Sequence, residues 1–172
     1  MKRLYLFRHC KAAGPADKMD DRDRPLAGRG PADATAISER LCVLGAAPDL
    51  ILCSSARRAV ETAEIAARAL PGPLLIEPED GLYDAATGDV LARLQSVDDS
   101  LGAVMVVAHN PTLGDLGLRL AGGGDPTLLA RLALNFPAGA VAGLEFEPDQ
   151  WSALAPGGGV LTLFLTPKSL GS

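Results

Sequence analysis

Residues 4–9 read Leu4-Tyr5-Leu6-Phe7-Arg8-His9, an apolar run near the N-terminus that ends in a cation and an imidazole. A short, continuous apolar run predicts a strand buried on both faces, and such strands belong to parallel sheets with helices on either side. Open α/β sheets bind ligands just beyond the carboxyl ends of their strands. We therefore expect Arg8 and His9 to lie where a binding site would form.

A second apolar run ends in the same way. Residues 103–108 read Ala-Val-Met-Val-Val-Ala and lead directly into His109-Asn110-Pro111. The chain contains two histidines, so each of them follows a predicted core strand. A lone histidine is more often structural than catalytic, but two histidines at the same edge of a predicted sheet favour a shared site.

Elsewhere the apolar pattern alternates between strand and helix. Short apolar runs predict strands over residues 49–53, 74–76, 140–146 and 160–165. Helical spacing predicts helices over 31–45, from Ser54-Ser55 as N-cap residues to about 70, over 88–98, from about 112 to a break at Gly122-Gly123-Gly124, and over 127–134. Residues 11–24 and 77–80 are expected to be polar loops, and the charged residues 20–24 could help frame the pocket at His9. This alternation predicts a three-layer α/β/α sandwich with a mostly parallel central sheet.

The length and composition of the chain limit how many domains it can form and which partners it can attract. A chain of 172 residues with 48% apolar residues is expected to form a single globular domain over residues 1–172. The net charge of −5 gives no general attraction for nucleic acid or for an anionic membrane, so an anion site would have to be local. No run is long enough for a signal sequence or a membrane span. The three cysteines, an odd number, favour reduced thiols, and we expect a soluble, cytoplasmic protein.

Histidines and arginines at strand ends suit phosphoryl transfer. An imidazole nitrogen can accept a phosphoryl group and form a covalent intermediate, while nearby arginines neutralise the charge on its oxygens. The planar guanidinium group suits this task because it can bind two phosphate oxygens at once. The sequence therefore offers the residue types that a phosphate site needs, without a metal or an organic cofactor.

Four ordered motifs carry a family resemblance: Arg8-His9, Arg24-Pro25-Leu26 with Gly30, the run from Ser54 to Ala59 with Thr62, and His109-Asn110-Pro111. In these motifs the chain resembles the histidine phosphatase superfamily and, more narrowly, its small bacterial phosphohistidine phosphatases. The resemblance implies a phosphoglycerate-mutase-like fold without a large cap insertion. It also implies a metal-independent phosphatase that needs no cofactor.

The same resemblance implies roles for individual residues. His9 would be the nucleophile that becomes phosphorylated, Arg8 and Arg58 would hold the phosphate, and His109 would complete the pocket. Asn110 and Arg24 are candidates for substrate binding. Glu79 and Asp80 are the nearest candidates for a general acid, although His109 could serve the leaving group instead.

The chain also departs from the family pattern. Cys10 follows the nucleophile where the family has Gly or Ala, and Ala108 precedes the second histidine where the family has Gly. Both residues are small, so we expect both to be tolerated.

Other interpretations of the cysteines, the histidines and the glycine-rich stretches have less support in the sequence. Cys53 is separated from Arg58 by four residues, whereas cysteine phosphatases have five, and Cys10 lacks a matching arginine. A metal site formed by His9, His109 and a cysteine would lack a closely spaced ligand pair. The glycine-rich stretches carry no nucleotide-binding signature and are expected to be turns.

The substrate class rests on the short connections of the chain. The stretch 74–101, where larger members of the superfamily carry inserted capping segments, has room for one loop and one helix. An open pocket suits a phosphorylated side chain on a protein surface, so we expect phosphohistidine on a signalling or phosphotransfer protein as the substrate. A small-molecule phosphomonoester is the alternative. A non-catalytic module that binds phosphate or a phosphopeptide is a further possibility, and the oligomeric state is open.

Overall fold

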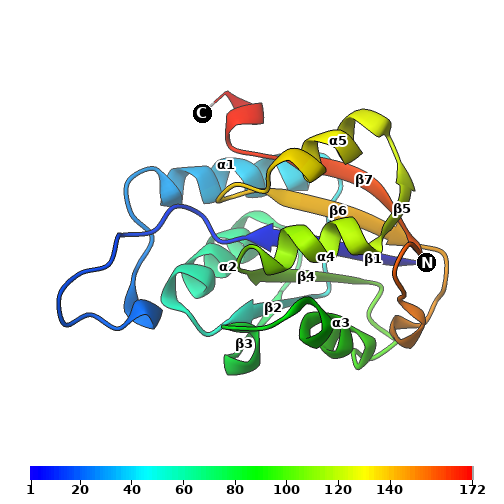
Figure 1. The fold of residues 1–172 in the computed structure, drawn as a ribbon, viewed down its shortest axis with the longest axis horizontal. Helices are drawn as coiled ribbons and strands as arrows, with labels where there is room; N and C mark the ends of the chain where they lie inside the picture. The colour runs from blue at the N-terminus through cyan, green and yellow to red at the C-terminus, as the bar shows by residue number, and fades with distance from the viewer. Residues whose placement is uncertain (172) are drawn as a thin grey trace.

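One sheet organises the structure, a computed structural model that describes residues 1–171. Within these residues the sheet has seven strands in the order β3-β2-β4-β1-β6-β7-β5 (Figure 1). The strands are β1 (Lys2–Arg8), β2 (Leu50–Ser54), β3 (Leu75–Glu79), β4 (Ala103–Ala108), β5 (Ala121–Gly124), β6 (Val141–Phe146) and β7 (Gly159–Leu165).

The sheet is mostly parallel, as predicted. The pairs β1–β4, β4–β2, β2–β3 and β5–β7 are parallel, whereas β6 runs antiparallel to both of its neighbours, β1 and β7. The carboxyl ends of β1, β2 and β4 therefore meet at one edge of the sheet, and that edge receives the residues that follow each strand.

Helices cover both faces of the sheet, which confirms the three-layer α/β/α arrangement. Leu4 and Leu6 of β1 pack into one core cluster with residues of α3 (Thr87–Gln95) and α4 (Thr112–Leu120). Tyr5 and Phe7 alternate with them and pack on the other face with α1 (Gly30–Val43) and α2 (Arg57–Ala69). This burial on both faces explains why residues 4–7 of β1 are all apolar. A further helix, α5 (Pro126–Leu134), adds Leu132 to the first cluster.

The predicted cap of α2 is wrong. Ser54 is the last residue of β2, and α2 begins at Arg57 with Ala56 as an N-cap that forms no side-chain capping bond. The Ser54 hydroxyl instead accepts a 3.1 Å hydrogen bond from the backbone N–H of Ala56 and contacts His109. The hydroxyl group that was expected to cap the helix is therefore in contact with His109, a residue from a distant part of the chain.

Two segments predicted as a turn and a loop belong to the sheet. Residues 121–124 form the edge strand β5, where a Cβ atom on Gly122 would lie 1.9 Å from the carbonyl oxygen of Gly157. Only glycine allows this backbone approach, so the glycines permit the strand and do not simply break a helix. Residues 77–79 extend β3, because Glu77 and Glu79 are compatible with an edge strand whose carboxylates pair with Arg93.

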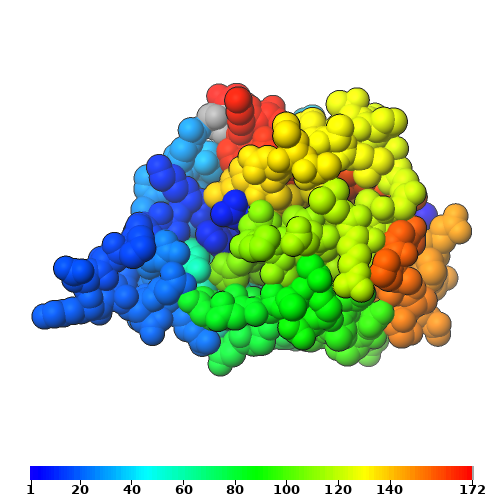
Figure 2. Space-filling view, in the orientation of Figure 1, coloured from blue at the N-terminus to red at the C-terminus, as the bar shows by residue number. Residues whose placement is uncertain are grey.

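A long polar loop joins β1 to α1 and includes the short 3-10 helix η1 (Asp21–Asp23). Figure 2 shows this loop, in blue, projecting from the rest of the molecule. Its two ends are joined by an isolated bridge between Ala12 and Leu26. Gly30, the first residue of α1, lies so close to this bridge that an added Cβ atom would be 2.1 Å from the Lys11 carbonyl oxygen.

Of the described helices, none is long and apolar enough to cross a membrane.

Candidate active site

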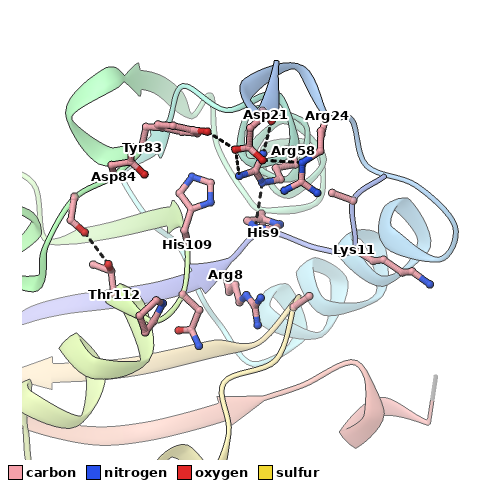
Figure 3. A pocket seen from close by; sticks show the side chains of 15 residues that line it. Arg8, His9, Lys11, Asp21, Arg24, Arg58, Tyr83, Asp84, His109 and Thr112 are labelled. Atoms are coloured by element: carbon pink, nitrogen blue, oxygen red, sulfur yellow. Dashed lines mark hydrogen bonds and ion pairs between the residues drawn. The ribbon is translucent and has the colours of Figure 1, made fainter. Parts of the chain in front are cut away.

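The carboxyl edge of the sheet brings the four principal candidates together. His9 follows β1, His109 follows β4, and Arg58 lies in the first turn of α2, just beyond β2. The two imidazole rings are 5.1 Å apart between centroids, at an angle of 62°. They share a pocket of about 550 Å³ (Figure 3). Its lining comprises Arg8, His9, Lys11, Ala12, Asp21, Arg24, Arg58, Tyr83, Asp84, Ala85, His109, Asn110, Pro111, Thr112 and Ala138.

Hydrogen bonds determine which nitrogen of His9 is available. The backbone N–H of His9 donates to the carbonyl oxygen of Ala108 at 3.1 Å, which ties the end of β1 to β4. Nδ1 of the ring lies 2.8 Å from the carbonyl oxygen of Cys10. A carbonyl oxygen can only accept, so Nδ1 carries the hydrogen and Nε2 keeps its lone pair. Nε–H of Arg58 points at this lone pair from 3.4 Å.

Both histidines are held in the neutral form. Burial is the largest cause that lowers the pKa of His9, to about 3, and the charges of His109, Arg58 and Arg8 act in the same direction. The pKa of His109 is lowered to about 4, mainly by burial and then by Arg58, although the carboxylates of Asp21 and Asp84 oppose the shift. At neutral pH the His9 lone pair is therefore available without prior loss of a proton.

The second histidine is oriented by a hydroxyl and an aromatic ring. Nε2 of His109 lies 2.7 Å from the Ser54 hydroxyl oxygen, at the end of β2. The Tyr83 and His109 rings are nearly perpendicular, at 85°, with 5.6 Å between centroids. His109 is therefore held between β2 and the segment that follows β3.

Arg8 lines the pocket with a guanidinium group that is only partly paired among the described residues. Its Nη1 donates a 3.0 Å hydrogen bond to the carbonyl oxygen of Phe136. Its Nε is buried without a hydrogen-bond partner among the described residues. Burial also lowers the pKa of the guanidinium group. A buried N–H without a partner is costly. Arg8 lines the pocket, where a guanidinium group can bind an anion.

Arg58 is a buried cation with most of its bonds directed to one residue. Nη1 donates to the backbone carbonyl oxygen of Asp21 at 2.8 Å, and Nη2 donates to its carboxylate at 3.0 Å. The remaining side of the guanidinium group, with Nε, faces His9 (Figure 3). A phosphoryl group on Nε2 of His9 would lie next to this side.

The two other binding candidates also line the pocket, and each already bonds to the rest of the chain through some of its polar atoms. Arg24 donates from Nε to the Asp21 carboxylate at 2.9 Å and from Nη1 to the carbonyl oxygen of Ala13 at 2.8 Å. The side-chain oxygen of Asn110 accepts a 2.9 Å bond from the backbone N–H of Gly114. Both residues therefore help to hold the pocket walls.

The structure places the two general-acid candidates away from the histidines. Glu79 belongs to β3 and accepts a 2.8 Å hydrogen bond from Nε of Arg93. Asp80 is exposed and pairs with Arg22 at 3.0 Å. Neither residue lines the pocket. The carboxylates that do are Asp21 and Asp84.

Sequence reasoning missed Asp21, Tyr83 and Asp84 as individual site residues. Asp21 belongs to the charged residues expected to frame the pocket, yet nothing in the pattern distinguished it from its acidic neighbours. Tyr83 donates a short hydrogen bond to the Asp21 carboxylate. This contact spans a separation of 62 residues, so no local pattern could have revealed it.

The two buried cysteines are unsuited to nucleophilic chemistry, and no metal site is formed by the part of the chain that the structure describes. Burial raises the pKa of the Cys10 and Cys53 thiols to about 12. A thiol with such a pKa stays protonated at neutral pH. Within residues 1–171, no three His, Cys, Asp or Glu side chains are grouped so that they could hold a metal ion.

Sequence comparison agrees with the geometry. The profile of the histidine phosphatase superfamily (branch 1) matches residues 4–98. The uncharacterized protein Rv1276c of Mycobacterium tuberculosis is 34% identical over 164 residues, which cover 94% of this chain and 100% of that protein.

Solved structures extend the comparison to the whole fold. A candidate phosphohistidine phosphatase, SixA from Agrobacterium tumefaciens, is 32% identical with a TM-score of 0.79, and the match covers 96% of this chain and 98% of that chain. The protein histidine phosphatase SixA complexed with tungstate is 25% identical with a TM-score of 0.78, and the match covers 98% and 99% of the two chains. Motifs, fold and profile thus agree, and this chain belongs to the histidine phosphatase superfamily.

Proposed function

We propose that this protein is a phosphatase that transfers a phosphoryl group to Nε2 of His9 and then to water. The observation that carries the proposal is the pairing of His9 Nδ1 with the Cys10 carbonyl oxygen, which leaves Nε2 as a free lone pair opposite Arg58. Arg8 and Arg58 would bind the equatorial oxygens of the phosphoryl group, where negative charge must be stabilised. His109 would contact the same group from the other side of the pocket.

The chemistry proceeds in two steps. In the first, Nε2 of His9 bonds to phosphorus while the bond from phosphorus to the substrate breaks, and its electron pair returns to the leaving group. Nδ1–H of His9 stays bonded to the Cys10 carbonyl oxygen, so the phosphorylated ring keeps its orientation. In the second, water attacks phosphorus and the electron pair of the P–N bond returns to Nε2. Both protons of the water stay on the inorganic phosphate that is released, and His9 returns to its neutral form with Nδ1 protonated.

Phosphohistidine on a protein is the substrate that this site suits best. An imidazole whose other ring nitrogen carries a hydrogen can leave as a neutral molecule, whereas an alkoxide needs a general acid. Glu79 and Asp80 do not line the pocket, and hydrogen bonds from Tyr83 and Arg58 keep the pKa of Asp21 far below its usual range. A substrate with a good leaving group suits this set of residues. SixA is described both as a phosphohistidine phosphatase and as a tungstate complex, and tungstate is a tetrahedral oxyanion like phosphate.

Trapping the intermediate tests the proposal. A rapid quench of the wild type with a ³²P-labelled phosphohistidine protein should give acid-labile, alkali-stable label on the peptide that contains His9. His9→Ala should give no label and no turnover. Cys10→Ala is the matched control, because it changes the adjacent residue to one that the family uses, and it should retain label and turnover. Equal turnover by His9→Ala and the wild type would refute the assignment.

A second experiment separates the candidate substrates. We expect a higher kcat/KM on a phosphohistidine-bearing phosphotransfer protein than on a panel of metabolite phosphomonoesters. A higher kcat/KM on a metabolite would point to a small-molecule phosphatase. Phosphate binding without turnover on any substrate would point to a non-catalytic phosphate-binding module.

Metal independence is part of the proposal. Arg8 and Arg58 supply the positive charge that a metal ion supplies in other phosphoryl-transfer enzymes. Turnover should therefore survive prolonged dialysis against EDTA and should not rise when divalent cations are added back. Restoration of a lost activity by one divalent cation would contradict this part of the proposal.

A further inference from the structure

Asp21 makes more polar contacts to the side chains of the pocket than its place in a surface loop would suggest. Its carboxylate accepts hydrogen bonds from Arg58, Arg24 and Tyr83. Its backbone carbonyl oxygen accepts a further bond from Nη1 of Arg58 at 2.8 Å. One residue of the loop between β1 and α1 is thus bonded to α2 and to the segment after β3 (Figure 3).

The geometry of Arg58 divides its donors into two sets. Nη1 and Nη2, at the end of the guanidinium group, both bind Asp21. Nε faces Nε2 of His9. A guanidinium group can bind a second pair of oxygens through Nε and the adjacent Nη nitrogen. Asp21 therefore occupies the end of Arg58 and leaves its side, toward His9, for the phosphoryl group.

The carboxylate is itself held from two directions. Arg24 binds its Oδ1 at 2.9 Å, while Tyr83 and Arg58 bind Oδ2. Arg24 is anchored in turn by the Ala13 carbonyl oxygen at 2.8 Å, and the Arg22 guanidinium stacks over the Tyr83 ring at 4.4 Å. These contacts fix Asp21 in position even though its own side chain is half exposed.

We propose that Asp21 is a positioning residue that sets the orientation of Arg58 relative to Nε2 of His9. Arginine has several rotatable bonds, and a buried arginine with no fixed partner could aim its donors in several directions. The Asp21 carboxylate removes this freedom before the substrate arrives, so the donors are oriented before charge develops on the phosphoryl oxygens. The inference rests on the proposed phosphatase function and deepens it.

A double-mutant cycle tests whether Asp21 acts through Arg58. The variants are Asp21→Asn, Arg58→Ala and the double variant, assayed with p-nitrophenyl phosphate, whose leaving group needs no general acid. Asp23→Asn is the matched control, because it removes the same charge from the same 3-10 helix at an exposed residue. Inorganic phosphate serves as a competitive inhibitor to measure binding.

Asp21→Asn should lower kcat/KM by roughly 10- to 100-fold, by analogy with residues that orient metal-binding side chains in other enzymes. It should weaken inhibition by phosphate, and Asp23→Asn should leave both values unchanged. In the Arg58→Ala background the effect of Asp21→Asn should shrink to about twofold or less, because the group that it orients is absent.

Other outcomes would overturn the inference. A full effect of Asp21→Asn in the Arg58→Ala background would mean that Asp21 acts on the substrate directly. Tighter inhibition by phosphate in Asp21→Asn would mean that the carboxylate competes with phosphate for Arg58. Unchanged kinetics in Asp21→Asn would mean that its contacts are structural only, and the phosphatase function would stand. A wild type without turnover would instead be a failure of the proposed function.

If Asp21→Asn does not fold, Tyr83→Phe gives the same information, because it removes one of the hydrogen bonds that hold the carboxylate. It should lower kcat/KM several-fold in the wild-type background and have no effect in the Arg58→Ala background. An equal effect in both backgrounds would count against the inference.

Discussion

The hydroxyl oxygen of Ser54 lies 2.7 Å from Nε2 of His109 and also accepts the backbone N–H of Ala56. A hydroxyl group has one hydrogen and two lone pairs, so it can donate to the imidazole while it accepts from the backbone. One buried side chain at the end of β2 thus connects the second histidine to the start of α2. This contact leads to the first prediction.

Ser54→Ala should lower both stability and activity. The change leaves the buried N–H of Ala56 without its acceptor, which costs about 1–3 kcal/mol of unfolding free energy. It also releases His109 and should reduce kcat/KM by roughly tenfold. Urea denaturation and steady-state kinetics measure the two effects. The neighbouring Ser55→Ala is the control, because the buried Ser55 hydroxyl has no partner within residues 1–171 and its removal should cost nothing.

As the pH falls, kcat/KM should decrease only at an unusually low pH. The pKa of His9 is lowered to about 3 and that of His109 to about 4, from an ordinary value of 6.5. The nucleophile must be neutral, so activity on p-nitrophenyl phosphate should be lost with an apparent pKa near 3 to 4 as the pH falls. Loss of activity with an apparent pKa near 6.5 would show that burial does not control the pKa values of these two histidines.

The same shifts predict how stability changes with pH. Below pH 6.5 the unfolded chain takes up protons at both histidines, whereas the folded protein does not until the pH nears the lowered pKa values. The unfolded state then binds more protons, so the unfolding free energy should fall as the pH falls from 6.5 toward 4. Urea titrations of the wild type and His9→Ala measure this, and the variant should show a shallower decrease.

Arg8→Lys should weaken phosphate binding even though it keeps the charge. Nη1 of Arg8 donates to the Phe136 carbonyl oxygen, and Nε is buried without a partner in the part of the chain that the structure describes. The lysine ammonium cannot satisfy both positions at once, so the inhibition constant of inorganic phosphate should rise by roughly tenfold or more. Arg3→Lys is the control, because Arg3 lies near the other end of β1 and pairs with Glu145. Equal inhibition constants for Arg8→Lys and the wild type would argue against a fork-like contact.

Gly30→Ala should destabilise the loop between β1 and α1. The new Cβ atom would lie 2.1 Å from the Lys11 carbonyl oxygen, and a backbone atom cannot move without shifting the wall of the pocket. We expect a loss of roughly 1–3 kcal/mol, as for other overpacked sites, together with reduced activity. Thermal denaturation and kinetics measure these effects. Gly14→Ala, in the same loop, meets no atom within 4 Å and should be neutral.

Local sequence patterns were enough to predict the layers of the fold and the position of the two histidines. The run Leu4–Phe7 is apolar at every position because alternate side chains enter the two core clusters on opposite faces of the sheet. A strand of this kind can be recognised locally, and the residues that follow it are then placed at the ligand-binding edge. His9 and His109 could therefore be assigned to one edge although 100 residues separate them.

The residues that surround the histidines could not be predicted in the same way, because contacts between distant segments bring them there. Asp21 lies among several acidic residues of similar pattern, and its contact with Arg58 joins positions 37 residues apart. Ser54 looked like a helix cap, but its hydroxyl group contacts His109, which follows another strand, β4. Glu79 looked available, but its place on the edge strand pairs it with Arg93. Local periodicity specifies which face of an element is buried, whereas polar partners are chosen by the three-dimensional approach of segments far apart in the chain, and a single sequence carries no local signal of that approach.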